Sequence, residues 1–184
     1  MITVTCAKFN YGWRIAALDV DQYSLDGETA PQMYQRALSD SAKGYLVNVV
    51  NTMELASRCL RPSPFWKYHD EDNMSTFYSK AIQNANAAYK FPIVVTAVPS
   101  QPRIFRISNQ NIAEGDFPSV YYLSKIKLSD TSAIKKENLQ LRKVIERVLP
   151  GLSKEKKYVL YSAFNDMPQS NRYVKSVDIT DRLW

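Results

Sequence analysis

The chain has 184 residues, 45% of them hydrophobic, and it includes 3 Trp, 12 Tyr and 7 Phe. Its formal net charge is +6. This composition excludes a disordered polymer, and no apolar run approaches the roughly 18 residues that a membrane span needs. No signal-peptide pattern opens the chain, so we expect a cytoplasmic protein with no membrane partner. Cys6 and Cys59 are then expected as buried free thiols, with a disulfide as the alternative.

The first half of the chain predicts a hairpin followed by helices. Met1–Phe9 and Trp13–Val20 are rich in β-branched and aromatic residues and flank a short turn. The apolar side chains of Thr29–Leu60 recur at helical spacing, and Gln32 completes a capping-box pattern at the start. Gly44 lies inside this stretch and can split it into two helices.

The second half predicts a sheet around one further helix. A helix is expected from Asp70 to Ala88 and another from about Thr131 to Pro150. Strands are expected at Pro92–Val98, Arg103–Ser108, Val120–Leu128, Tyr158–Phe164 and Tyr173–Ile179, with 109–118 as a loop. The order ββ-αα-βββ-α-ββ predicts one α+β domain over residues 1–184, with a mainly antiparallel sheet and about three helices on one face.

The basic excess lies in the last third of the chain. Residues 121–184 carry 13 Lys and Arg against 7 Asp and Glu, whereas the preceding 120 residues sum to zero. Such asymmetry is typical of a surface for phosphates or an acidic partner, although a solvated face gives the same pattern. Alternation in Val120–Leu128 predicts that Val120 and Tyr122 face the helices and that the other side faces water or a ligand.

These features predict a non-enzymatic accessory protein that binds DNA or RNA through its C-terminal third. The cations would contact phosphates and the tyrosine would stack on a base. The residues expected at this interface are Tyr121, Lys125, Lys127, Lys136, Lys143, Arg147 and Lys157.

Two alternatives remain open at this point. The first is a protein-interaction, assembly or inhibitory subunit, for example of a virus or mobile element, since tyrosine and arginine are favoured at interfaces. The second is a metal-dependent nuclease that uses Asp19 and Asp21 with Asp166 or Asp178 as a third acid. The chain has 5 Gly and 1 His, and we expect no cofactor, since no phosphate-binding glycine motif is present. The sequence does not specify the oligomeric state.

Overall fold

The computed structural model describes residues 1–63, 65–169 and 174–183, and it is mixed α and β. Within these residues there are four helices, where about three were expected, and nine strands, so the α+β class is confirmed. The helices are α1 (Ala30–Ala42), α2 (Leu46–Arg58), α3 (Glu71–Ala88) and α4 (Thr131–Val148). The strands are β1 (Ile2–Phe9), β2 (Gly12–Val20), β3 (Ser24–Leu25), β4 (Glu28–Thr29), β5 (Ile93–Val94), β6 (Arg103–Ile112), β7 (Gly115–Leu123), β8 (Tyr158–Phe164) and β9 (Ser176–Arg182).

The extra helix comes from the split of the Thr29–Leu60 stretch. The predicted capping box is present, because the Thr29 backbone N–H donates to Oε1 of Gln32 at 2.8 Å. Helix α1 then ends at Ala42, and Gly44 takes φ +75°. Glycine adopts this left-handed conformation freely, so the chain turns there and begins α2 as a separate helix.

The main sheet has the strand order β5-β6-β7-β8-β9. Three of its pairings are antiparallel, and β7 pairs with β8 in parallel. A parallel pair needs a crossover connection, and α4 provides it between these two strands. No helix in the described ranges is long and apolar enough to cross a membrane.

Several strand boundaries differ from the sequence prediction, and the strand expected at Pro92–Val98 is reduced to β5, Ile93–Val94. The expected loop 109–118 belongs largely to β6 and β7, which pair as far as Ile112 and Gly115. Its polar side chains suggested a loop, but the two backbones satisfy each other's hydrogen bonds at this end of the hairpin. The strand expected to reach Leu128 ends at Leu123. The last strand is Ser176–Arg182, and Tyr173, where it was expected to begin, lies outside the described residues.

The larger hydrophobic core lies between α4 and one face of the main sheet. Val120 and Tyr122 belong to this core together with Leu141 of α4, as the alternation of the strand predicted. Burial raises the pKa of the Tyr122 and Tyr161 hydroxyls, so both remain protonated at any physiological pH. A second core joins α1, α2 and α3, with methionines at its centre.

The helical layer of α1 to α3 is joined to the sheet by an ion pair. Arg58 at the end of α2 lies 3.0 Å from a carboxylate oxygen of Asp116 on β7 and 2.7 Å from one of Glu54. The Asp116 side chain is almost fully buried, so Arg58 supplies the charge that this carboxylate needs. At the other end of α2, Gly151 packs against Tyr45, where an added Cβ would lie 2.3 Å from the tyrosine ring.

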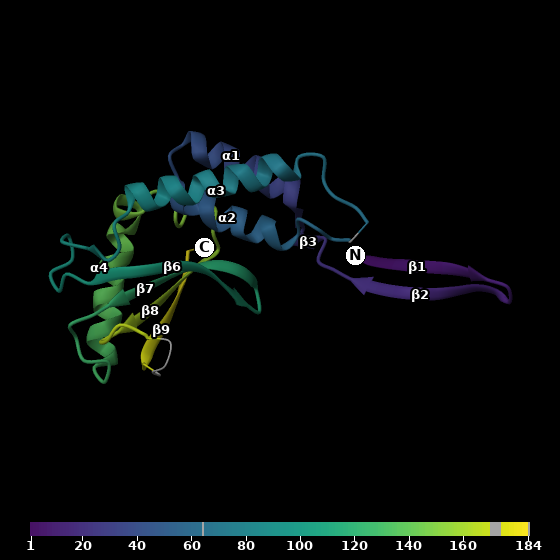
Figure 1. Cartoon of the computed structure of the whole chain (residues 1–184). Coiled ribbons are helices and arrows are strands. Elements are labelled where there is room, and N and C mark those ends of the chain that lie inside the picture. The colour runs from purple at the N-terminus through teal and green to yellow at the C-terminus, as the bar shows by residue number, and fades with distance from the viewer. Residues whose placement is uncertain (64, 170–173, 184) are drawn as a thin grey trace.

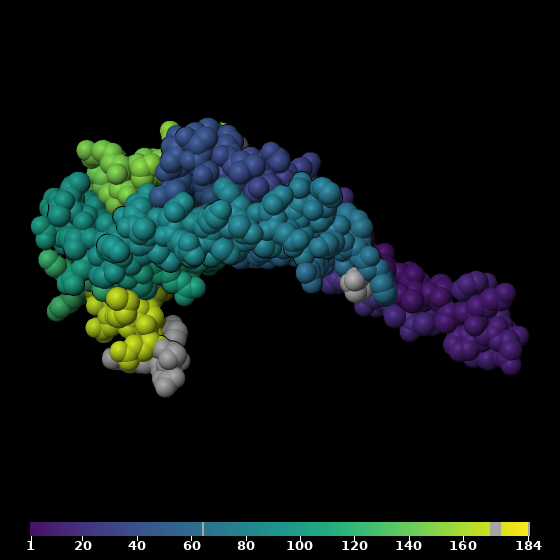
Figure 2. Space-filling model, turned by 45° about the horizontal axis from the view of Figure 1, so that its top comes forward, coloured from purple at the N-terminus to yellow at the C-terminus, as the bar shows by residue number. Residues whose placement is uncertain are grey.

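Strands β1 and β2 form a hairpin that projects away from the rest of the molecule. Figure 1 shows them extending from the end of the helical layer, and Figure 2 shows the same segment standing clear of the body. We call this segment, residues 2–20, the arm. The prediction of an opening hairpin is confirmed, with Phe9 paired to Gly12 at the turn. The expectation of two buried thiols is wrong for Cys6, which is exposed on the arm, whereas Cys59 is buried.

Candidate functional site

The seven residues predicted to bind nucleic acid lie in different places around the main sheet. Two lysines follow the C-terminal end of β7, three cations lie on the exposed side of α4, and one lysine precedes β8. Because β7 and β8 are parallel, the last of these lies at the opposite end of the strands from the first two. The tyrosine lies on the sheet face opposite α4, since its neighbours on β7 pack on the other side. Lys125 and Lys127 are the two lysines that follow β7, and Lys136, Lys143 and Arg147 are the three cations on α4. Lys157 precedes β8, and Tyr121 is the tyrosine on the other face of the sheet.

Four cations gather at the end of the sheet where β7 and β8 finish. They line two adjoining hollows of about 390 and 370 Å³, which share Lys127. We call the group of Arg103, Lys125, Lys127 and Lys175 the basic end. None of the four forms an ion pair with another residue in the described part of the chain. Asp166 is the one acid among the described residues that line the two hollows. The basic end therefore has unpaired positive charge directed at open space.

The loop that carries Lys125 and Lys127 is fixed by one asparagine. The side-chain amide of Asn165 donates to the carbonyl oxygens of Ser124 and Ile126 at 3.0 and 2.7 Å. Its Oδ1 accepts a hydrogen bond from the backbone N–H of Leu128 at 3.1 Å. The Asn165 side chain thus bonds both carbonyl and N–H groups of the loop backbone, which has no strand partner.

An aromatic cluster lies next to the basic end, on the face of the main sheet opposite α4. The ring centroids of Phe105 and Phe164 each lie 6.3 Å from the ring centroid of Tyr121. The Arg106 guanidinium carbon lies 5.4 Å from the same centroid. Arg103 pairs with the residue two places after Tyr121, so it lies on this same face. Tyr121 is half-buried and Arg106 is exposed. An arginine stacked on an aromatic ring presents a second flat surface on which a base can stack.

Sequence reasoning missed Arg103, Phe105 and Arg106. All three lie in a strand that was predicted, but their position beside Tyr121 depends on the pairing register of β6 with β7. That register contains an irregularity between Ile104 and Arg106, which the sequence pattern does not reveal.

The exposed side of α4 has a row of cations without intervening acids. Lys136, Lys143 and Arg147 are all exposed. The glutamates that alternate with them in sequence point elsewhere: Glu137 is 2% exposed, and Glu146 accepts hydrogen bonds from the backbone N–H of Gly151 and of a residue beyond it, at 2.9 and 2.7 Å. The structure therefore concentrates positive charge that alternates with glutamates in the linear sequence. We call these three residues the α4 row.

Lys157 is the most isolated of the predicted contacts. Its amine lies 5.4 Å from the ring centre of Tyr158, and the side chain is half-buried. A cation held over an aromatic ring in this way is already partly compensated.

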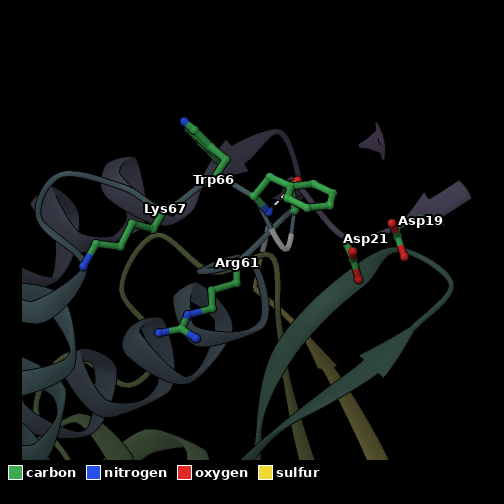
Figure 3. Close-up of a pocket in the computed structure, with 7 residues that line it drawn as sticks. Asp19, Asp21, Arg61, Trp66 and Lys67 are labelled. Atoms are coloured by element: carbon green, nitrogen blue, oxygen red, sulfur yellow. Dashed lines mark hydrogen bonds between the residues drawn. The ribbon is translucent and has the colours of Figure 1, made fainter. Parts of the chain in front are cut away.

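Asp19 and Asp21 line a hollow at the root of the arm that is larger than either hollow of the basic end. This hollow measures about 690 Å³ and is also lined by Arg61, Trp66 and Lys67, as Figure 3 shows. Arg61 is 2.6 Å from a carboxylate oxygen of Glu71 and is thus already paired. Among the described residues, no group of three or more histidine, cysteine or acidic side chains could hold a metal ion. The third acid expected at a nuclease centre, Asp166 or Asp178, does not join this pair.

No family model matches this chain, and neither a curated protein nor a solved structure matches it. The function must therefore be argued from the surfaces themselves. They define an α+β protein with a cationic and aromatic end on its main sheet and a projecting β-arm.

Proposed function

We propose that this protein binds single-stranded nucleic acid through the basic end and the adjoining aromatic cluster. The observation that carries the proposal is the convergence of four unpaired cations, from three separated segments of the chain, on two adjoining hollows. Phosphate binding requires cations that converge, because each neutralised phosphate releases condensed counterions.

The aromatic cluster favours a single strand over a duplex. Unpaired bases can stack on half-exposed aromatic rings and on an arginine plane, whereas the bases of a duplex are already stacked on each other. Phe105, Tyr121 and Arg106 offer such surfaces on the same sheet face as Arg103. Contacts of this kind depend on the phosphate backbone and on base planes, so binding would depend little on sequence.

The role that we propose is non-enzymatic and accessory, in the cytoplasm and without a cofactor. The α4 row and Lys157 are then secondary contacts at most, because they lie on other surfaces than the basic end. A nucleic-acid strand that bound mainly to the α4 row would contact no ring of the aromatic cluster.

The test compares two double variants with the same loss of charge. Fluorescence anisotropy of labelled single-stranded DNA, single-stranded RNA and duplex DNA is measured across a salt series. The variant Lys125→Gln/Lys127→Gln should weaken single-strand binding. The slope of log K against log[salt] should become less negative by about 1.4, because each of the two lost phosphate contacts contributes roughly 0.7. The matched control Lys136→Gln/Lys143→Gln should leave both the affinity and the slope nearly unchanged.

A third variant tests stacking. Tyr121→Leu keeps an apolar side chain in the half-buried position and should reduce affinity by the ~1–3 kcal/mol that one stacked base contributes, without changing the salt slope. The absence of binding at low salt would contradict the proposal. So would an affinity that falls only when the α4 row is changed. Cleavage of the labelled strand on addition of Mg²⁺ would instead support the nuclease alternative at Asp19 and Asp21.

A further inference from the structure

The two faces of the arm differ sharply in polarity. Cross-strand partners share a face, so the pairing register assigns every side chain to one side or the other. One face carries the pairs Thr3–Asp19, Thr5–Ala17 and Ala7–Arg14, with Phe9–Gly12 at the turn. The opposite face, which we call the apolar face, carries the pairs Ile2–Val20, Val4–Leu18, Cys6–Ile15 and Lys8–Trp13.

The apolar face has no partner in the described part of the chain. Ile15 and Val20 are 68% and 70% exposed, and the least exposed of its large apolar side chains, Val4, is still 49% exposed. Beyond its root, the arm stands clear of the helices and of the main sheet (Figures 1 and 2). Soluble monomers rarely expose a continuous apolar surface of this kind, and an isolated two-stranded hairpin is only marginally stable in water.

We propose that the apolar face of the arm packs against the apolar face of the arm of a second copy of this chain. The six large apolar side chains of the face are 49 to 70% exposed. Together they offer an apolar area on the order of several hundred Å² per copy, which is the scale of area that each partner buries in a stable interface. A second copy also has an apolar strip of the same length and width, as a two-fold interface requires.

The charges on the arm favour an antiparallel arrangement of the two copies. Lys8, near the tip, is the one charged side chain in the four pairs of the apolar face. With the arms parallel, the two Lys8 amines would approach each other, and like charges that face each other across an interface oppose binding. With the arms antiparallel, each Lys8 lies over the root of the other arm, far from the second Lys8. The antiparallel arrangement therefore removes this repulsion.

The same charges argue against a polyanion as the partner of the arm. Lys8 and Arg14 are balanced by Asp19 and Asp21, so the arm and its root have no net positive charge to attract phosphates. The arm dimer is thus independent of the nucleic-acid proposal. Either proposal can fail without the other.

The test uses two double variants at adjacent cross-strand pairs. Val4→Asp/Leu18→Asp places two charges on the apolar face, and Thr5→Asp/Ala17→Asp places the same two charges on the opposite face. Light scattering after size-exclusion chromatography, over a range of protein concentrations, should give a dimer mass for the wild type and for Thr5→Asp/Ala17→Asp. The mass of Val4→Asp/Leu18→Asp should be that of a monomer, with a dissociation constant raised about 100-fold or more. Circular dichroism should show the helices intact in all three proteins.

Cys6 provides a second readout that needs no substitution. It is exposed and lies next to the midpoint of the four pairs, so the antiparallel dimer brings the two Cys6 thiols near the two-fold axis. A short bifunctional maleimide should therefore link two wild-type chains covalently. The same reagent should leave Val4→Asp/Leu18→Asp unlinked, and Cys59, which is buried, should not react in the folded protein.

Three results would overturn the proposal. The first is a wild-type protein that remains a monomer at all concentrations, including one that binds lipid vesicles as a monomer. The second is equal dissociation by both double variants, because that would place the contact at the arm edges instead of its apolar face. The third is a dimer that persists in Val4→Asp/Leu18→Asp.

Discussion

The two long hairpins of this protein have similar local geometry and different surroundings. The β1–β2 hairpin has strands of 8 and 9 residues, and the β6–β7 hairpin has strands of 10 and 9 residues. Both are antiparallel and both contain a register irregularity. Strand β7 pairs further with β8, and the face that β6 and β7 share is covered by α4, so that Ile104, Val120 and Tyr122 are fully buried. The arm acquires neither a third strand nor a helix from the described part of the chain.

The comparison of the two hairpins shows what an alternating sequence pattern specifies and what it does not. Alternation of apolar and polar residues specifies which side chains share a face of a hairpin. It does not specify what covers that face, because the cover is supplied by distant segments or by another chain. The apolar side of β6–β7 is covered within the molecule, and the apolar side of the arm is exposed.

The largest expected effect contrasts two isoleucines, one in each hairpin. Ile104 is 0% exposed and Ile15 is 68% exposed. Ile104→Ala removes buried side-chain volume and should lower the free energy of unfolding by about 3 kcal/mol. Ile15→Ala should change it by no more than about 0.5 kcal/mol in dilute protein, where the arm is unpaired. Urea denaturation followed by circular dichroism measures both. Equal losses would mean that the arm folds back onto the body.

The next effect concerns the ion pair that joins the helical layer to the sheet. Arg58→Met leaves the buried Asp116 carboxylate without its cation, and we expect a loss of about 2 kcal/mol, reduced by the partial exposure of Arg58. Lys67→Met is the matched control, since Lys67 lies 3.8 Å from a carboxylate oxygen of Asp72, which is 91% exposed. The control should lose almost nothing. A loss of similar size in both variants would argue against the special role of the buried carboxylate.

A smaller effect, of opposite sign, is expected at Lys156. Burial, together with the nearby Arg36 guanidinium, lowers the pKa of this amine. The folded state therefore favours the neutral amine, and the charged amine destabilises it at pH values below the lowered pKa. The stability of the wild type should rise as the pH increases from that pKa towards the ordinary lysine value. Lys156→Met should be more stable at pH 7 by about 1 kcal/mol and should lack this rise.

Thermal unfolding at pH 7 and at pH 10 tests this expectation, with the exposed Lys154→Met as control. The control should follow the wild type at both pH values. A Lys156→Met variant that is less stable than the wild type at pH 7 would show that the nearby carboxylates stabilise the charged amine more than burial destabilises it.

The smallest expected effect is at the root of the arm. Asp19 and Asp21 are not joined by a third metal-binding side chain among the described residues. Addition of Mg²⁺ should therefore shift the unfolding temperature by less than about 1 °C, and Asp19→Asn/Asp21→Asn should respond in the same way. A clear Mg²⁺-dependent stabilisation that is lost in the double variant would contradict this expectation.

Local features of the fold were predictable from sequence, and features that depend on distant pairing were not. The opening hairpin, the capping box at Thr29 and the buried side of Val120 and Tyr122 all follow from residue type and spacing. The parallel pairing of β7 with β8 does not, because no local pattern distinguishes it from an antiparallel pairing. The exposure of Cys6 was missed for the same reason, since apolar neighbours indicate burial only when something covers them.

The candidate site shows the same limit. Lys125 and Lys127 were identified from their charge, but their convergence with Arg103 and Lys175 results from the strand order and from loops at one end of the sheet. The separation of the α4 row from the basic end also depends on the crossover helix lying on one face of the sheet. Charge counted along the chain does not contain this information.

The three hydrogen bonds of Asn165 have a consequence for the thermodynamics of binding. Because they fix the backbone that carries Lys125 and Lys127, a ligand would not have to order this loop, and the entropic cost of binding is reduced. Replacing Asn165 with alanine removes no charge, so the number of counterions released would stay the same while the affinity falls. Calorimetry would then register the loss as a less favourable binding entropy.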